Sequence, residues 1–94
     1  MPKVILNDIV LAEHPNPPVV EGNYYFPPES VKNELFMDSD TTTHCPWKGD
    51  AKYYNVNVKG DAVKDVAWYY PQPFDKAAHI KDHIAFYKTK VQIA

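Results

Sequence analysis

Short runs of β-branched and aromatic residues, each closed by turn residues, dominate this chain of 94 residues. The clearest runs form two pairs, 4–6 with 9–11 around Asn7-Asp8, and 51–58 with 63–70 around Lys59-Gly60-Asp61. Two such runs on either side of a short polar turn predict a β-hairpin. The connections are too short for the crossover helices that a parallel sheet needs. We therefore expect a mainly β chain whose strands pair antiparallel.

The remaining segments predict fewer and shorter strands. We expect a strand over 19–26 with a bulge or turn at Gly22-Asn23, a polar loop over 38–43, and a last strand over 84–87 that the tail extends. A chain of 94 residues holds a single core. We therefore expect one domain over residues 1–94.

Two short helices complete the expected α+β arrangement. The first covers 28–36, where proline suits the first turn and where Val31 and Leu35, four residues apart, face the core. The second covers 76–81, and Asp75 is placed to cap it.

Aromatic residues stand in adjacent groups on the expected strands. The groups are Tyr24-Tyr25-Phe26, Tyr53-Tyr54 and Trp68-Tyr69-Tyr70. Neighbours in a strand point to opposite faces, so each group supplies both faces of a sheet. We expect two sets of residues to share a face: Tyr54 with Val56 and Val58, opposite Tyr53, and Val66 with Trp68 and Tyr70. A second face with aromatics either packs on another element or offers a binding surface.

The charges argue against one class of partner. Ten lysines, no arginine and twelve acids give a net charge of −2, and the lysines are scattered among the acids. Nucleic-acid-binding proteins carry a basic stripe, so we expect no nucleic-acid partner. No apolar run approaches the roughly 18 residues of a membrane helix. Charges follow Met1 too early for a secretory signal, so we expect a cytoplasmic protein with no membrane partner.

The sequence lacks the motifs of disulfide, metal and phosphate-loop chemistry. Cys45 is the one cysteine, which excludes an internal disulfide and a four-thiolate zinc site. His79 and His83 have the spacing of two ligands on a helix, but Ile80 stands where zinc proteases have glutamate. The three glycines are isolated, so no phosphate-binding loop can be written. We expect no metal and no cofactor.

Cys45 leaves two alternatives open. His44 adjoins it, but adjacent strand residues point to opposite faces, so the two cannot form a direct nucleophile–base pair. The thiol is then either a buried, inert side chain or a reactive group whose pKa a cation such as Lys48 lowers. Lys48 and His44 also supply the few polar groups that a ligand pocket needs.

Four ordered blocks resemble the family of the domain of unknown function 427. They are residues 20–27, residues 43–54 with a Cys-Pro-x-Lys-Gly-x-Ala-x-Tyr pattern, residues 67–73, and residues 84–87. The blocks span nearly the whole chain, which looks like a minimal, single-domain member. The resemblance implies a β-tent fold, in which two antiparallel sheets meet at an angle. Related folds hold zinc with Cys-x-x-Cys motifs, which this chain lacks.

The resemblance also implies a pocket between the sheets. By motif position its lining residues are Cys45, Lys48, Tyr53, Trp68 and Tyr70. The family is sometimes labelled nucleotidyltransferase-like, but the chain has no carboxylate cluster for Mg²⁺ to support that label. We expect a small molecule to bind in this aromatic-lined pocket, and we favour binding over catalysis. The alternatives are a protein-interaction or homodimer module, and a thiol enzyme that uses Cys45 with an external thiol.

Overall fold

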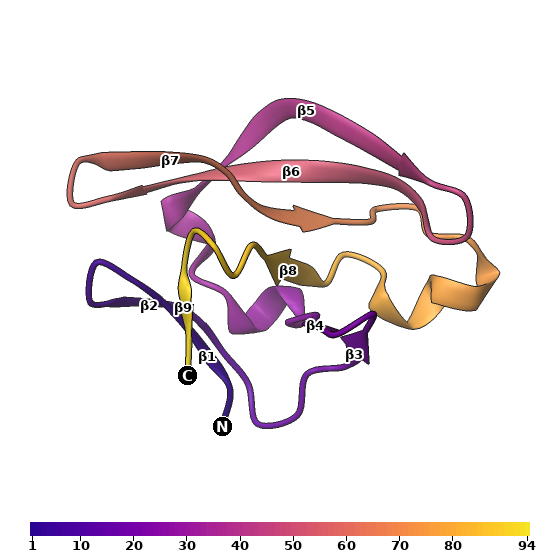
Figure 1. Ribbon diagram of the computed structural model, residues 1–94, viewed down its shortest axis with the longest axis horizontal. Coiled ribbons are helices and arrows are strands. Elements are labelled where there is room, and N and C mark those ends of the chain that lie inside the picture. Colours follow the sequence, from indigo (N-terminus) through magenta and orange to yellow (C-terminus); the bar gives the residue numbers. More distant parts are fainter.

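Three antiparallel sheets hold the nine strands of the computed structural model, which describes residues 1–94 (Figure 1). The largest sheet has the order β5-β6-β7-β8, with β5 (Phe36–Cys45), β6 (Gly49–Val58), β7 (Asp61–Tyr69) and β8 (Ile84–Phe86). The second has the order β2-β1-β9, with β1 (Lys3–Leu6), β2 (Ile9–Glu13) and β9 (Gln92–Ile93). The third is the hairpin of β3 (Val19–Val20) and β4 (Asn23–Tyr24). The expected mainly β, α+β arrangement is confirmed.

The hairpin turns form where the turn residues predict them. Both central residues have positive φ at Asn7-Asp8 (50° and 65°) and at Lys59-Gly60 (52° and 83°). Such turns match the twist of the strands that they join. A third turn of this kind, at Glu21-Gly22 with φ of 54° and 80°, divides the expected strand over 19–26 into β3 and β4.

The expected loop over 38–43 is wrong. These residues lie inside β5, which pairs antiparallel with β6 through a bulge between Asp38 and Thr42. None of the ten side chains of β5 is buried, so its polar residues keep their contact with water. Its threonines are β-branched and favour extended backbone. The polar composition is therefore compatible with a strand that other elements leave uncovered.

The helical segments are short 3-10 helices, and the expected helix over 28–36 is divided into two of them. They are η1 (Pro28–Ser30), η2 (Asn33–Leu35) and η3 (Asp75–Ile80). Val31, between the first two turns, is buried in a bridge to Ala12, and Leu35 packs against the same core, as expected. The expected cap is wrong, because Asp75 is the first residue of η3 and Phe74 occupies the capping position without a side-chain hydrogen bond. No helix is long and apolar enough to cross a bilayer.

The expectation that the tail extends β8 is wrong. The tail turns away from β8 and joins the second sheet. The amides of Lys90 and Val91 donate to the carbonyl of Tyr87, over 2.9 and 3.2 Å, and close a turn that leads into β9. β9 then pairs with β1. The two chain ends lie side by side, because Lys3 and Ala94 exchange backbone hydrogen bonds of 3.0 and 2.9 Å (Figure 1).

The two faces of the four-stranded sheet belong to two different hydrophobic clusters. We call the side that packs on β1 and β2 the first face; its residues include Tyr54, Val56, Val58, Ala67, Tyr69, Ile84 and Phe86. The other side is the second face; its residues are Ala51, Tyr53, Trp68, Tyr70 and Ala85. The aromatic groups are divided between the faces as their alternation predicts.

One expected face assignment is wrong. Val66 packs in the first cluster, away from Trp68 and Tyr70. The register of β6 and β7 shifts between Tyr54 and Val56, and Asp65 has φ of 53° at that irregularity. This bulge adds residues to β7 and turns Val66 toward the first face, where Ala67 also packs.

Candidate functional site

The five predicted site residues gather at the second face. Tyr53 lies on β6, Trp68 lies on β7, and Tyr70 follows β7 directly. Cys45 ends β5 and packs against the same cluster. Lys48 lies in the turn between β5 and β6, with its ammonium nitrogen 5.5 Å from the centre of the Tyr70 ring. The structure thus brings together residues that are up to 25 positions apart in the sequence (70 minus 45).

Lys48 is the only charged residue in the buried core, with 6% of its surface exposed. Its Nζ donates to Glu21 Oε1 and lies 5.2 Å from the centre of the Trp47 ring. Burial alone lowers the pKa of Lys48, but the hydrogen bond to Glu21 and nearby charges outweigh burial and raise that pKa overall. The same hydrogen bond holds the pKa of Glu21 below its usual value. Lys48 is therefore a charged ammonium between two aromatic rings.

The backbone around Lys48 is fixed on both sides. Gly49 has φ of 115°, and a Cβ there would lie 3.2 Å from the carbonyl oxygen of Gln72, so only glycine fits without strain. The carbonyl of Lys48 accepts a 2.9 Å hydrogen bond from the amide of Phe74. The turn that carries Lys48 is therefore held against the segment that follows β7.

Trp68 sits between two tyrosines on the second face. Its indole Nε1 donates to the hydroxyl of Tyr25 over 3.1 Å, and the two rings meet edge to face at 6.4 Å. On its other side the Tyr87 ring centre lies 4.7 Å away. Tyr25 is buried, whereas Trp68 is half-buried and Tyr87 keeps 36% of its surface exposed. The aromatic surface is closed at Tyr25 and open at Tyr87.

Tyr53 connects the aromatic surface to β5. Its hydroxyl lies 3.0 Å from Thr43 Oγ1 and accepts a 3.4 Å hydrogen bond from the hydroxyl of Tyr87. The rings of Tyr53 and Tyr87 stack with their centres 6.3 Å apart. The bond to Tyr53, together with burial, raises the pKa of Tyr87 to about 12. Burial raises the pKa of Tyr70 to about 12, against the opposing charge of Lys48. These phenols stay neutral at physiological pH and act there as hydrogen-bonding groups.

Cys45 is half-buried at the edge of the cluster. Its neighbour His44 pairs across the sheet with Asp50, and His44 Nδ1 lies 2.6 Å from Asp50 Oδ1. The histidine is thus engaged on the exposed side, as the alternation of strand residues predicts. No three His, Cys, Asp or Glu side chains lie close enough together to hold a metal ion.

Sequence reasoning missed Glu21 and Tyr87 as parts of the site. Glu21 lies 27 positions from Lys48 in the sequence, and only the folding of the β3–β4 hairpin brings the two together. Tyr87 looked like the end of a strand, yet it leaves β8 and covers Trp68. A signal for Tyr25 was present, because it belongs to an aromatic group that must supply both faces.

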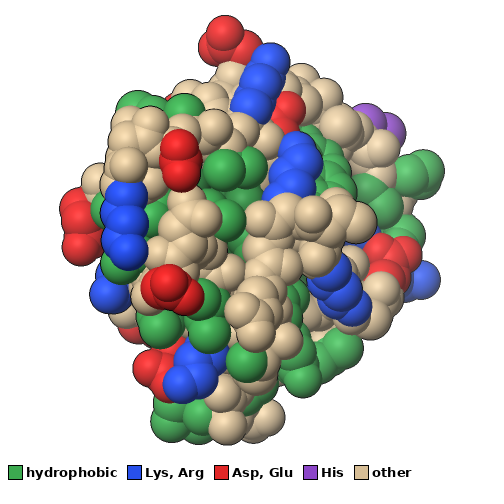
Figure 2. Space-filling model, turned by 60° about the vertical axis from the view of Figure 1, so that its left-hand side comes forward, with side chains coloured by type: hydrophobic (Ala, Val, Ile, Leu, Met, Phe, Trp, Pro, Cys, Tyr) green, Lys and Arg blue, Asp and Glu red, His purple; other side chains and the backbone are tan.

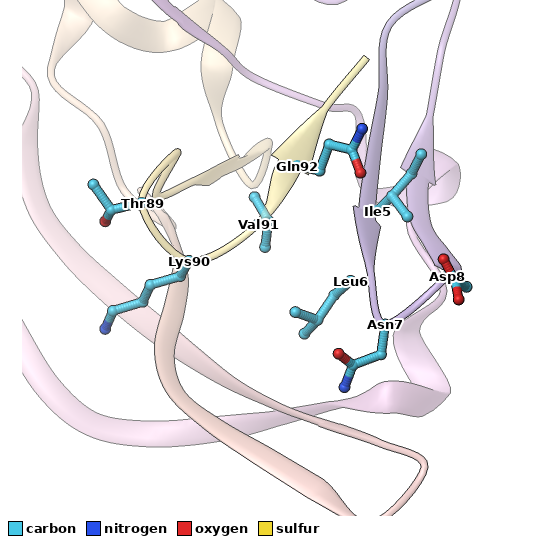
Figure 3. Close-up of a pocket in the computed structure, with 8 residues that line it drawn as sticks. All are labelled: Ile5, Leu6, Asn7, Asp8, Thr89, Lys90, Val91 and Gln92. Atoms are coloured by element: carbon cyan, nitrogen blue, oxygen red, sulfur yellow. The ribbon is translucent and has the colours of Figure 1, made fainter.

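The cavities of the molecule lie elsewhere. A groove of about 560 Å³ opens between the β1–β2 turn and residues 89–92 (Figure 3). Another of about 270 Å³ lies between β2 and η1. Of the predicted site residues only Tyr53 lines a cavity, one of about 160 Å³ shared with Asp38 and Tyr69. Neither Trp68, which is half-buried, nor Lys48, which is buried, lines any of these cavities.

Charges on the surface are mixed. Lysine and acidic side chains alternate with apolar ones across the face drawn in Figure 2, with no large area of one sign. This agrees with the interleaving of lysines and acids along the chain. The buried ammonium of Lys48 is therefore the distinctive charge of the molecule.

Comparison with known proteins assigns a family. No curated protein matches the chain. A family model described as a domain of unknown function, DUF427, matches residues 3–94. That match covers all four of the sequence blocks on which the resemblance rested. The chain therefore belongs to the DUF427 family.

Proposed function

We propose that this protein binds a small molecule with a flat ring on the open part of the second face, beside Lys48. The observation that carries the proposal is the position of Lys48, a buried ammonium between the exposed ring of Trp47 and the buried ring of Tyr70. Ligand sites commonly combine an apolar, aromatic lining with a few fixed polar groups. Lys48 supplies the polar group, and Trp68 with Tyr87 supplies the lining.

Stability alone does not explain why a lysine is buried at position 48. Taking an ammonium out of water costs free energy that an ion pair offsets only in part, and an apolar side chain of similar volume often stabilises the fold equally well. The partner carboxylate of Glu21 is half-exposed, so water weakens its attraction to the ammonium. A lysine in such a position is better explained by a molecule that it binds.

The aromatic rings supply the larger contact area. Trp68 is half-buried and Tyr87 is partly exposed, so both present ring surface that a ligand can cover. A good stacking or cation–π contact contributes about 0.5–2 kcal/mol. A hydrogen bond from Lys48 adds to these contacts, and burial of the ring adds about 25 cal/mol for each Å² of apolar surface removed from water.

Native mass spectrometry of the protein purified gently from its own cells tests the proposal. We expect one extra mass per chain on the wild type and on the control Lys64→Met, which changes an exposed lysine on β7. Lys48→Met keeps the aliphatic stem, removes the ammonium, and should lose the extra mass. Retention of the same mass by a folded Lys48→Met protein would exclude Lys48 from the site.

A homodimer is the second candidate function, and exposed aromatic side chains favour it. Trp47 and Phe74 keep 38% and 48% of their surface exposed, and both adjoin Lys48, Trp47 along the chain and Phe74 through its amide hydrogen bond to the Lys48 carbonyl. Exposed aromatics of this size are enriched at protein interfaces. The same mass spectrum distinguishes the candidates: a bare dimer in place of a liganded chain supports self-association.

A further inference from the structure

The Glu21 carboxylate occupies a binding position for an anion. Its Oε1 accepts from Lys48 Nζ, and its Oε2 accepts from the indole Nε1 of Trp47 over 3.4 Å. An ammonium and an indole N–H thus point at the two oxygens of one carboxylate. Yet the residue that supplies this carboxylate is a surface side chain, with 51% of its side-chain surface exposed. The donors belong to the site, whereas the acceptor comes from a hairpin tip.

That hairpin tip is a small element. β3 and β4 have two residues each, and Glu21 is one of the two turn residues with positive φ. A second lysine holds the tip: Lys88 Nζ donates to the carbonyl of Gly22 over 2.8 Å. The Glu21 side chain can rotate into solvent without unpairing β3 and β4, because the backbone of the turn is held by Lys88 and not by the carboxylate.

The anion position adjoins the aromatic surface through Tyr25. The Tyr25 hydroxyl accepts from the Trp68 indole, and Tyr25 packs in one cluster with Tyr70, whose ring centre lies 5.5 Å from Lys48 Nζ. Trp68 and Lys48 are therefore connected through two tyrosines of the same cluster. A ligand with its ring on Trp68 and an acidic group on the Tyr70 side of that ring is directed toward Lys48.

From this arrangement we infer that the ligand carries a carboxylate, which replaces the Glu21 carboxylate on Lys48 and Trp47. The inference rests on the proposed function and names its ligand class, a flat ring with a carboxylate attached. Exchange of one carboxylate for another leaves the charge around Lys48 balanced. A neutral ligand would leave Lys48 without a counter-charge, and a cation would meet a like charge. Glu21 is then a competitor that reduces the affinity for the ligand.

The test uses benzoate and its neutral analogue benzamide as probes. The two tryptophans, Trp47 and Trp68, give two indole N–H signals in an NMR spectrum, one at each end of the site. We expect benzoate to shift both signals and benzamide to bind more weakly. Glu21→Gln removes the competing charge and should tighten benzoate binding about five-fold, because more of the protein has a free Lys48. It should leave benzamide binding unchanged.

Asp50→Asn is the matched control. It makes the same change in net charge two residues from Lys48, on an exposed side chain that pairs with His44. Equal tightening of benzoate in both variants, or weaker binding in Glu21→Gln, overturns the inference. If both probes bind Trp68 alike in every variant, the ligand class is wrong while the proposed function stands. If neither probe shifts Trp68 in any variant, the aromatic surface binds no flat ring and the proposed function fails with it.

Discussion

The two faces of the four-stranded sheet are built by alternate residues of the same strands, yet they differ in what packs against them. A three-stranded sheet covers the first face, and the side chains of Phe26, Val56 and Phe86 there are almost fully buried. On the second face η3 contributes only Ala77 and Ile80 to the cluster. The rest of that face holds the buried rings of Tyr53 and Tyr70 and the half-buried Trp68, with the buried Lys48 beside Tyr70. The candidate site therefore forms where polar aromatic rings and one buried ammonium pack together.

The comparison also separates two uses of aromatic rings. On the first face Phe26, Phe36 and Phe86 pack edge to face at 6.0 Å, an arrangement that fills volume. On the second face Trp68, Tyr25 and Tyr87 carry polar atoms, which hydrogen-bond among themselves or with neighbouring residues. Rings of the first kind are expected to govern stability, and rings of the second kind to govern binding.

The largest effect is expected from truncation of Phe26. Phe26→Ala removes a fully buried ring that contacts Phe86, and a change of this kind costs about 3–5 kcal/mol. Urea denaturation measures the loss, which approaches the whole stability of a small domain. Tyr87→Ala, on the second face, should cost less, about 1–2 kcal/mol, because 36% of the surface of Tyr87 is already exposed to water. Equal losses would contradict the division between the faces.

A change of pH acts on both faces at once. Tyr54 on the first face and Tyr70 on the second have pKa values raised to about 12 from 10.0, in both cases chiefly by burial. The folded chain therefore keeps protons that the unfolded chain loses, so the contribution of these two phenols to the free energy of unfolding is constant below pH 10 and falls as the pH rises toward 12.

Denaturation at pH 9 and pH 11, with phenolate absorbance as the titration signal, measures this loss. Tyr70→Phe and Tyr54→Phe should each make the alkaline loss smaller than in the wild type, because each removes one shifted phenol. Identical pH profiles for the wild type and both variants would refute the assignment of the shifts to these two residues.

The alternation of strand residues predicts most of the assignment of side chains to the two faces of the sheet. The alternation of Tyr53 with Tyr54 placed one ring on each face, and the structure agrees. The prediction for Val66 is wrong because a bulge at Asp65 interrupts the alternation. A pattern with a period of two residues cannot reveal an inserted residue. The polar residues of β5 were misread because polarity marks both loops and edge strands.

The sequence predicts the candidate site in part, because strand patterning also places most of its residues. Four of its five residues lie on strands or at strand ends, where local rules and the family resemblance agree. The partner of Lys48 depends on tertiary structure, since Glu21 comes from a hairpin that the sequence left as either a bulge or a turn. Contacts between distant segments leave no local periodicity, so no pattern along the chain could have paired them.

Removal of one hydroxyl tests the closed end of the second face. Tyr25→Phe deletes the acceptor of the Trp68 indole N–H and leaves that donor without its partner. We expect a loss of about 1 kcal/mol, typical of one net hydrogen bond, together with a shift of the Trp68 indole signal in the NMR spectrum. Phe substitutions on the first face cannot produce that shift. An unchanged indole signal would show that the bond does not form in solution.

The smallest expected effect on stability comes from Lys48→Met, and it sharpens the comparison most. Methionine keeps the stem between Trp47 and Tyr70, and Glu21 loses only a partner that it can replace with water, so we expect the free energy of unfolding at pH 7 to change by less than about 1 kcal/mol.

The pKa of Glu21 should nevertheless respond. It is lowered from 4.5 first by the hydrogen bond from Lys48, so that bond stabilises the fold above pH 4.5 and is lost as the pH falls through the folded-state pKa. In Lys48→Met the NMR titration of the Glu21 carboxyl carbon should return to the ordinary midpoint. A restored midpoint with unchanged stability would mean that the chain keeps a buried charge that its fold does not need. A loss of about 3–5 kcal/mol would instead make the pair a structural element, and the second face would then resemble the first.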